Sequence, residues 1–134
     1  MNLLEVKNLS VVFRRNKVKT QVLNNVSFTI NKNQTLALVG ESGSGKSVSA
    51  LSILQLLPKY SAEYISGSVK IEGKEYLQSN INNISEVRGQ KISMIFQEPM
   101  TSLNPLHNIE KQITECFATS QKSNKSKCIN LLKE

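Results

Sequence analysis

Residues 40–47 read Gly40-Glu41-Ser42-Gly43-Ser44-Gly45-Lys46-Ser47, a run that fits the phosphate-binding pattern G-x-x-x-x-G-K-[ST]. The residues before it, 34–39, form a short apolar run that predicts a buried parallel strand. The residues after it, 48–57, form an apolar run ended by Pro58 and predict a helix. Strand, glycine-rich loop and helix in this order are typical of a P-loop and predict an α/β fold. The alternative is a glycine-rich surface turn in front of a core helix.

The loop has the chemistry that a nucleotide triphosphate and Mg²⁺ require. Backbone N–H groups of a glycine-rich loop can point into one concavity, and the positive end of the helix dipole adds to them. Lys46 would place an ammonium on the β and γ phosphates, and the Ser47 hydroxyl would ligate Mg²⁺. Glu41 and Ser42 fill variable positions and are expected to contribute backbone contacts only. The predicted ATP-binding set within this segment is Gly40, Glu41, Ser42, Gly43, Ser44, Gly45, Lys46, Ser47 and Val48.

A second strand is predicted over residues 91–96, and it runs directly into Gln97-Glu98-Pro99-Met100-Thr101-Ser102-Leu103-Asn104-Pro105. A strand followed by this loop resembles the ABC transporter ATPases, in which a glutamine begins the Q-loop. The resemblance implies that Gln97 contacts Mg²⁺ or the attacking water, which makes Lys46 and Gln97 the expected catalytic residues. The sequences of residues 37–54 and 94–106 resemble those of the ATP-binding subunits of oligopeptide and dipeptide importers. The resemblance is closest to the tandem-ABC type that serves peptide and microcin C uptake.

The amino-terminal residues agree with this resemblance. Residues 3–13 and 22–30 resemble the paired antiparallel strands that open such domains. In the family an aromatic residue at the end of the first strand stacks on adenine, and Phe13 stands at that place. The alternative is that Phe13 only packs on the sheet, since phenylalanine is common in strands.

Several parts of a complete ATPase have no counterpart in this sequence. All ten acidic residues are glutamates, so no aspartate can serve as the Walker B carboxylate. Glu98 is disfavoured as a general base, because it follows Gln97 and precedes Pro99 in the order of a Q-loop. The family's signature motif, an LSGGQ-like sequence at a helix start, has no counterpart. Residues 65–68 look like part of it but predict a turn into a hairpin. His107 lies ten residues after Gln97 and is expected to be a surface histidine, not the family's switch histidine.

These features predict the front part of one ABC nucleotide-binding domain. Ile109, Ile113, Cys116 and Phe117 form the apolar stripe of an amphipathic helix, and a second helix is expected to begin near Ser126. The expected division is an antiparallel β subdomain over about 1–33 and 64–77, a P-loop core over 34–58 and 89–98, and the start of a helical subdomain over 106–134.

Composition limits the other readings. The net charge is +7, but the basic residues are scattered, so solvated basic faces are favoured over a nucleic-acid interface, and no nucleic-acid partner is expected. The longest apolar stretch is too short to span a bilayer and the start lacks a signal peptide, so a cytoplasmic chain without direct membrane insertion is expected. Cys116 and Cys128 have no metal-ligand spacing and are expected to be reduced thiols.

The resemblance implies an ATP-binding component that couples ATP hydrolysis to peptide import. Its implied partners are membrane permease subunits, which would hold it at the inner face of the cytoplasmic membrane, and a second ABC domain. Met100, Leu103 and Leu106 could contact a permease or pack within the helical subdomain. This chain alone is expected to bind Mg-ATP weakly, without sustained turnover. The alternatives are a self-sufficient P-loop kinase that uses Glu98 in place of aspartate, and a non-catalytic binding module.

Overall fold

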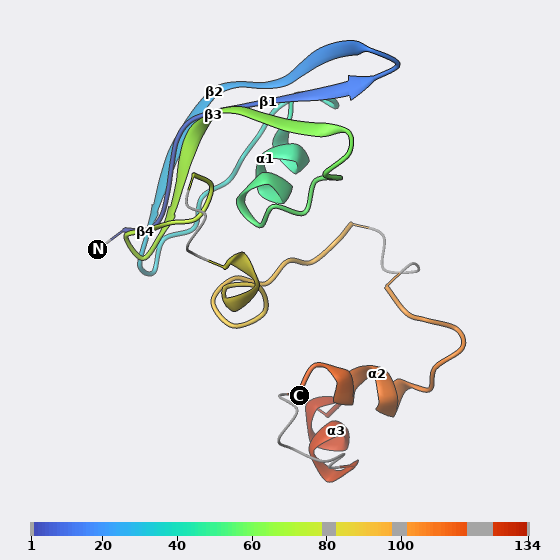
Figure 1. Ribbon diagram of the computed structural model, residues 1–134. Helices are drawn as coiled ribbons and strands as arrows, with labels where there is room; N and C mark the ends of the chain where they lie inside the picture. The colour runs from blue at the N-terminus through green and yellow to red at the C-terminus, as the bar shows by residue number, and fades with distance from the viewer. Residues whose placement is uncertain (1, 79–82, 98–101, 118–124, 134) are drawn as a thin grey trace. The chain divides into compact units, whose positions relative to one another are not determined.

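A computed structural model describes residues 2–78, 83–97, 102–117 and 125–133 of the chain. The chain divides into two compact units, Met1–Ser93 and Met94–Glu134. The first unit contains a β-sheet, helix α1 and the short 3-10 helix η1 (Ile84–Glu86), and the second contains helices α2 and α3 (Figure 1).

The sheet of the first unit has four strands in the order β2-β1-β3-β4, all paired antiparallel. The strands span Asn2–Arg15 (β1), Val18–Asn31 (β2), Ala62–Ile71 (β3) and Lys74–Glu75 (β4). The predicted antiparallel pair over residues 3–13 and 22–30 is confirmed, because β1 pairs with β2 from Asn2↔Asn31 to Arg15↔Val18. Strand β1 also pairs with β3 and is therefore bonded along both edges.

A bulge at Asn8 sets which side chains of β1 face the core. Strand side chains alternate between faces, and the buried series Leu4 and Val6 continues at Leu9 and Val11, one residue out of step. Asn8 has a positive φ of 49°, and the pairing register with β2 shifts between Val6 and Leu9. The Asn8 N–H donates to Ser27 Oγ at 2.8 Å, which fastens the bulge to β2.

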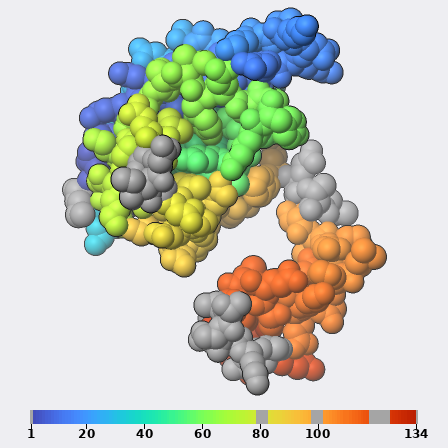
Figure 2. Space-filling model, in the orientation of Figure 1, coloured from blue at the N-terminus to red at the C-terminus, as the bar shows by residue number. Residues whose placement is uncertain are grey.

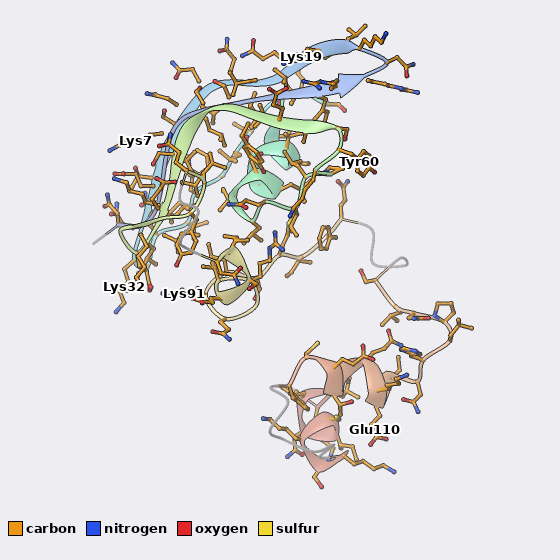
Figure 3. The ribbon with its side chains drawn as sticks, in the orientation of Figure 1. Lys7, Lys19, Lys32, Tyr60, Lys91 and Glu110 are labelled. Atoms are coloured by element: carbon orange, nitrogen blue, oxygen red, sulfur yellow. The ribbon has the colours of Figure 1, made fainter. Side chains whose placement is uncertain are left out.

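The β1–β2 hairpin turns on Asn16 and Lys17, whose φ values are 49° and 68°. Two consecutive positive φ values are those of the two-residue turn that matches the twist of paired strands. The tip of the hairpin extends past the end of β3 (Figure 1). It is blue in Figure 2, and Lys19 lies close to it (Figure 3).

Helix α1 (Lys46–Ile53) packs against the inner face of the sheet (Figure 1). The core contains buried side chains from the sheet, the α1 region and the segment around η1: Leu4, Val6, Leu9, Val11, Leu23, Ile53, Leu57, Val69, Ile71, Tyr76 and Val87. The helix ends before the predicted Leu57, because Gln55 takes a left-handed conformation with φ 51°. Leu57 is nevertheless buried, so the apolar run continues into the core without being helical.

The two strands predicted over residues 34–39 and 91–96 are not formed, and this part of the prediction is wrong. In the described residues, 34–39 have no strand partner, and Ile92 makes only an isolated bridge with Arg88. Leu38 is 43% exposed, and Val39 and Ile95 are 88% and 96% exposed. An apolar run has the composition of a buried strand, but a strand also requires a neighbouring backbone to accept and donate its hydrogen bonds.

The second unit contains the two helices expected near residues 109 and 126. Helix α2 spans Ile109–Glu115 and α3 spans Lys125–Leu131. Asn108 caps α2, since its Oδ1 accepts the Lys111 N–H at 2.8 Å. Phe117 lies just beyond α2, and the Lys127 ammonium of α3 lies 4.6 Å from the centre of its ring. Cys128 of α3 is buried. In the described ranges no helix combines the length and apolarity needed to cross a membrane.

Candidate nucleotide-binding site

The glycine-rich loop rests on strand β2 through Gly45. A Cβ atom added to Gly45 would lie 2.7 Å from Leu23 Cδ2 and 3.0 Å from the Val22 carbonyl oxygen. Gly45 is buried and has φ 90°, which L side chains rarely adopt. The last glycine of the motif is therefore required both for its backbone conformation and for close contact with the sheet. This contact fixes the start of α1 against β2.

The amino-terminal end of α1 is open to an anion. Gly45 stands at the N-cap position and supplies no side-chain cap, and the first turn carries no acidic residue. The first N–H groups of a helix have no partner within the helix, and the dipole makes this end positive. Because no carboxylate or hydroxyl occupies the cap, the amides at Lys46, Ser47 and Val48 can receive phosphate oxygens.

Lys46 is held over the loop by the loop's own oxygen atoms. Its Nζ donates to the carbonyl oxygens of Gly40 and Glu41 at 2.8 and 2.6 Å, and to Ser44 Oγ at 3.2 Å. The loop is further closed by the Ser44 N–H, which donates to the Glu41 carbonyl at 3.2 Å. The ammonium is thus already located at the mouth of the loop, beside the open helix end, and it adds charge where the amides alone would offer only dipoles.

The same loop packs tightly at its first glycine. A Cβ atom at Gly40 would lie 2.7 Å from Ser44 Oγ, one of the three oxygens that hold Lys46. By contrast, an added Cβ at Gly43 would meet nothing within 4 Å. Gly43, Ser44 and the variable Glu41 and Ser42 are exposed, as a surface that receives a ligand must be.

Ser47 is the residue predicted to ligate Mg²⁺. It lies in the first turn of α1, is exposed, and its hydroxyl makes no hydrogen bond within the described part of the chain. A free hydroxyl next to a phosphate site supplies the hard oxygen that Mg²⁺ prefers, while phosphates and water fill the other positions. The described residues contain no group of three His, Cys, Asp or Glu side chains that could hold a metal ion. The exposed Ser47 hydroxyl fits the hard oxygen that Mg²⁺ prefers, and its role as a magnesium ligand stays a prediction.

Phe13 lies near the end of β1, where it pairs with Thr20 of β2 and Ala62 of β3. Its ring is partly buried and packs against the core cluster. This packing is the alternative role that the sequence left open, and adenine stacking by Phe13 stays a prediction.

The other predicted residues lie outside the first unit. Gln97 is exposed and belongs to the second unit, so its contact with Mg²⁺ or water stays a prediction. Glu98 and Met100 lie outside the described residues. His107 is partly exposed, with Nε2 3.0 Å from Lys111 Nζ and Nδ1 3.7 Å from a Glu115 carboxylate oxygen.

Two hollows in the first unit lie away from the loop. One is lined by Asn2, Glu5, Lys70, Glu72 and Gly73, and the other, of about 460 Å³, is lined mainly by apolar residues from the ends of β1, β2 and β3 and by 90–92. A phosphate cradle is a shallow concavity of backbone N–H groups and not an apolar cavity, so the loop is identified by its donors and not by its volume.

Two contributions to the site were not visible in the sequence. Leu23 and Val22 support Gly45, but they are 22 and 23 residues away in sequence, and only the pairing of the chain brings them together. Arg88 contacts the far end of α1 and carries no motif that would have singled it out.

Comparison with known proteins agrees with this geometry. The family model described as ABC transporter matches residues 23–134. The chain is 56% identical over 116 residues to the uncharacterized ABC transporter ATP-binding protein YejF of Escherichia coli (strain K12), covering 87% of this chain and 22% of YejF. It is 50% identical over 119 residues to the peptidoglycan transport ATP-binding protein YejF of Agrobacterium fabrum, covering 89% and 22%. It is 49% identical over 113 residues to the oligopeptide transport ATP-binding protein AppD of Bacillus subtilis, covering 84% and 34%.

The matched segments thus cover between 22% and 34% of these relatives. The match to the family model includes the whole glycine-rich loop, helix α1 and the segment that follows Ile92. The open helix end, the lysine held at its mouth and the match over most of the chain agree with one another. The chain belongs to the ABC transporter family.

Proposed function

We propose that this chain forms the ATP-binding front part of a subunit that drives peptide import through an ABC transporter. The observation that carries the proposal is the Lys46 ammonium, held by Gly40 and Glu41 beside a helix end that has no cap. Two relatives are named for the transport of peptidoglycan and of oligopeptides, and these names support a peptide-like cargo for the transporter of this chain.

Binding would proceed through groups that the loop already presents. The uncapped amides of α1 would receive phosphate oxygens, and Lys46 would exchange part of its contact with the loop carbonyls for contact with phosphate. Ser47 would complete the coordination of Mg²⁺, an ion whose chemistry is to neutralise charge on the phosphates. Gln97 would orient water or metal, as the resemblance of its loop to a Q-loop implies.

Turnover would need groups that this sequence lacks. Without an aspartate to hold the magnesium shell, and without a signature motif from a second ABC domain, charge on the transferred phosphoryl group has no full set of partners. We therefore expect that the chain binds Mg-ATP weakly and does not sustain hydrolysis, which would occur in the complete transporter. Permease subunits would place it at the inner face of the cytoplasmic membrane.

A self-sufficient kinase would need arginines free to close over the phosphates. Of the three arginines, Arg14 is paired with Glu63 at 3.0 Å, and Arg88 donates to carbonyl oxygens of the α1 region. Only Arg15 at the hairpin tip has no such partner among the described residues. The contacts of the arginines therefore favour a transporter ATPase over a self-sufficient kinase.

Titration of the 134-residue chain with Mg-ATP by calorimetry tests the binding part. We expect saturable binding that Lys46→Ala abolishes, because the variant removes the ammonium held at the loop. Lys59→Ala is the matched control, since Lys59 is an exposed lysine beyond α1 and outside the motif. Equal binding by wild type and Lys46→Ala, or sustained phosphate release by the pure wild-type chain, would overturn the proposal.

The transport part is tested in cells that express the gene with either substitution. Uptake of a labelled oligopeptide should be lost with Lys46→Ala and retained with Lys59→Ala. Unchanged uptake with Lys46→Ala would contradict a role for this loop in import.

A further inference from the structure

The carboxyl-terminal end of α1 is held by side chains that come from other parts of the first unit. The helix stops at Ile53, and the left-handed turn at Gln55 lets the Gln55 and Leu56 N–H groups donate to the Ser52 and Leu51 carbonyls at 3.0 and 2.9 Å. The carbonyls that follow, those of Leu54 and Gln55, accept side-chain donors instead. Tyr64 of β3 donates its hydroxyl to the Ser52 carbonyl at 3.3 Å. The Gln55 side chain in turn donates to the Tyr76 carbonyl at 2.8 Å.

Arg88 makes the strongest of these contacts. Its Nε and Nη2 atoms donate to the Leu54 carbonyl oxygen at 2.9 and 2.6 Å, and Nη2 also donates to the Gln55 carbonyl oxygen at 2.9 Å. Hydrogen bonds from a charged donor are stronger than neutral ones. The guanidinium also places a full positive charge at the negative end of the helix dipole. The planar fork of donors fits two neighbouring carbonyls in a way that an ammonium cannot reproduce.

Arg88 is itself fixed by a tight loop that follows η1. Val87, the residue before it, is completely buried. The Val87 carbonyl oxygen accepts the N–H groups of Lys91 and Ile92 at 2.9 and 3.1 Å, and the Gly89 N–H donates to the Ile92 carbonyl at 2.9 Å. A buried anchor and these three backbone bonds leave the arginine little freedom, so a shift of α1 has to be met by a shift of the loop.

Helix α1 therefore has the phosphate loop at one end and Arg88 at the other. The helix has eight residues, so about two turns of hydrogen-bonded backbone separate the two ends, and such a short rod moves as a unit. We infer that Arg88 is a positioning residue for nucleotide binding. It holds α1 at the angle that aims the open amides at phosphate, and it transmits occupancy of the loop to the backbone bonds of Gly89–Ile92. The inference rests on the proposed ATP site.

The test measures Mg-ATP affinity and amide hydrogen exchange in the 134-residue chain and in Arg88→Ala and Arg88→Lys. Arg88→Ala should weaken binding about tenfold, the lower end of what a charged hydrogen bond contributes, because the side chain is exposed to solvent. Arg88→Lys keeps the charge without the fork and should lose less affinity. In wild type, Mg-ATP should slow exchange at Gly89, Lys91 and Ile92, and both variants should lose this response at saturating nucleotide.

The exchange measurement separates positioning from a purely structural role. A residue that only stabilises the unit would change the exchange rates without nucleotide but would leave the response to nucleotide intact. Lys74→Ala is the matched control, since it removes an exposed positive charge of β4 that lies outside both α1 and the loop of Gly89–Ile92. It should bind Mg-ATP as wild type does.

Each outcome decides between the two ideas. If wild type binds Mg-ATP and Arg88→Ala binds equally well, or if Arg88→Lys keeps the response at Gly89, Lys91 and Ile92, the positioning role is overturned and the ATP site stands. If the wild-type chain itself binds no Mg-ATP, the proposed function fails and the inference fails with it. If Arg88→Ala does not fold, Arg88→Lys alone decides.

Discussion

Strand β1 and the run of residues 34–39 are both rich in apolar side chains, yet only one of them is a strand. Strand β1 has β2 along one edge and β3 along the other, and Leu9 and Val11 in its centre are fully buried. Residues 34–39 have no strand partner among the described residues, and Val39 is 88% exposed. The difference does not lie in composition but in whether another backbone completes the hydrogen bonds.

The paired sheet, and not the run 34–39, supports the glycine-rich loop. The run 34–39 leads directly into Gly40, whereas the other side of the loop is fastened to β2 by Gly45. The loop therefore takes its position in this structure from the paired sheet and α1 and not from the strand-like run before it. Substitutions can challenge this conclusion by comparing matched positions inside and outside the paired sheet.

The largest effect is expected from Gly67→Ala. Gly67 lies in β3 opposite the bulge of β1, has φ 119°, and a Cβ atom there would lie 2.6 Å from the Leu9 Cα. Backbone strain and overpacking together should lower the free energy of unfolding by roughly 2–6 kcal/mol, measured by urea denaturation. Gly73→Ala is the control: it shares a positive φ of 81° but meets nothing within 4 Å, and should cost only about 1–2 kcal/mol. Equal losses would show that the bulge does not constrain the sheet.

The next effect compares a leucine of β1 with a leucine of the unpaired run. Leu9 is 0% exposed, and Leu9→Ala should lower the free energy of unfolding by about 2–5 kcal/mol, since it removes buried methyl groups and leaves a cavity. Leu38 is 43% exposed, and Leu38→Ala should change it by less than about 0.5 kcal/mol. Urea denaturation curves of both variants give the two values. A large loss with Leu38→Ala would show that residues 34–39 are packed after all.

A smaller, pH-dependent effect is expected at Glu75 in the short edge strand β4. Burial raises the pKa of this carboxyl, but hydrogen bonds from the Ser68 hydroxyl and from the N–H groups of Leu77, Val69 and Gln78 outweigh it and hold the pKa below its ordinary 4.5. A lowered pKa stabilises the fold above the ordinary value, and this contribution is lost as the pH falls through the lowered one.

Glu75→Gln should therefore be less stable than wild type near neutral pH, and the difference between the two should shrink as the pH falls below about 4.5. Urea midpoints measured across this range test the sign. A difference that grows on acidification would contradict the depressed pKa.

The smallest effect is expected at the hairpin tip. Glu63 of β3 pairs with Arg14 at 3.0 Å and with Lys19 at 2.9 Å, and all three side chains are largely solvated. Their hydrogen bonds and charges lower the pKa of Glu63, with Lys19 the main cause. Exposed ion pairs contribute little because water and salt screen them. Glu63→Gln should leave the thermal midpoint unchanged at both low and high salt. A clear drop at low salt only would mean that these pairs hold the tip to the sheet.

Local patterns were sufficient where each residue's environment depends on its neighbours in sequence. The loop follows from its motif, the antiparallel pair at the amino terminus from the resemblance to the family, and the helices near residues 46, 109 and 126 from the spacing of apolar residues. Prediction failed for 34–39 and 91–96, because strand formation depends on a partner that composition does not reveal. It also missed Leu23 beneath Gly45 and Arg88 at the end of α1, since both act across 22 or more residues of sequence.

The resting place of Lys46 has a consequence for selectivity. In the described part of the chain its ammonium touches only uncharged oxygens, those of Gly40, Glu41 and Ser44, so no carboxylate has to be displaced before an anion arrives. The loop then ranks ligands by the charge they bring and only weakly by the base they carry. Inorganic tripolyphosphate should compete with ATP for the chain, while adenosine, which carries the base without the charge, should not.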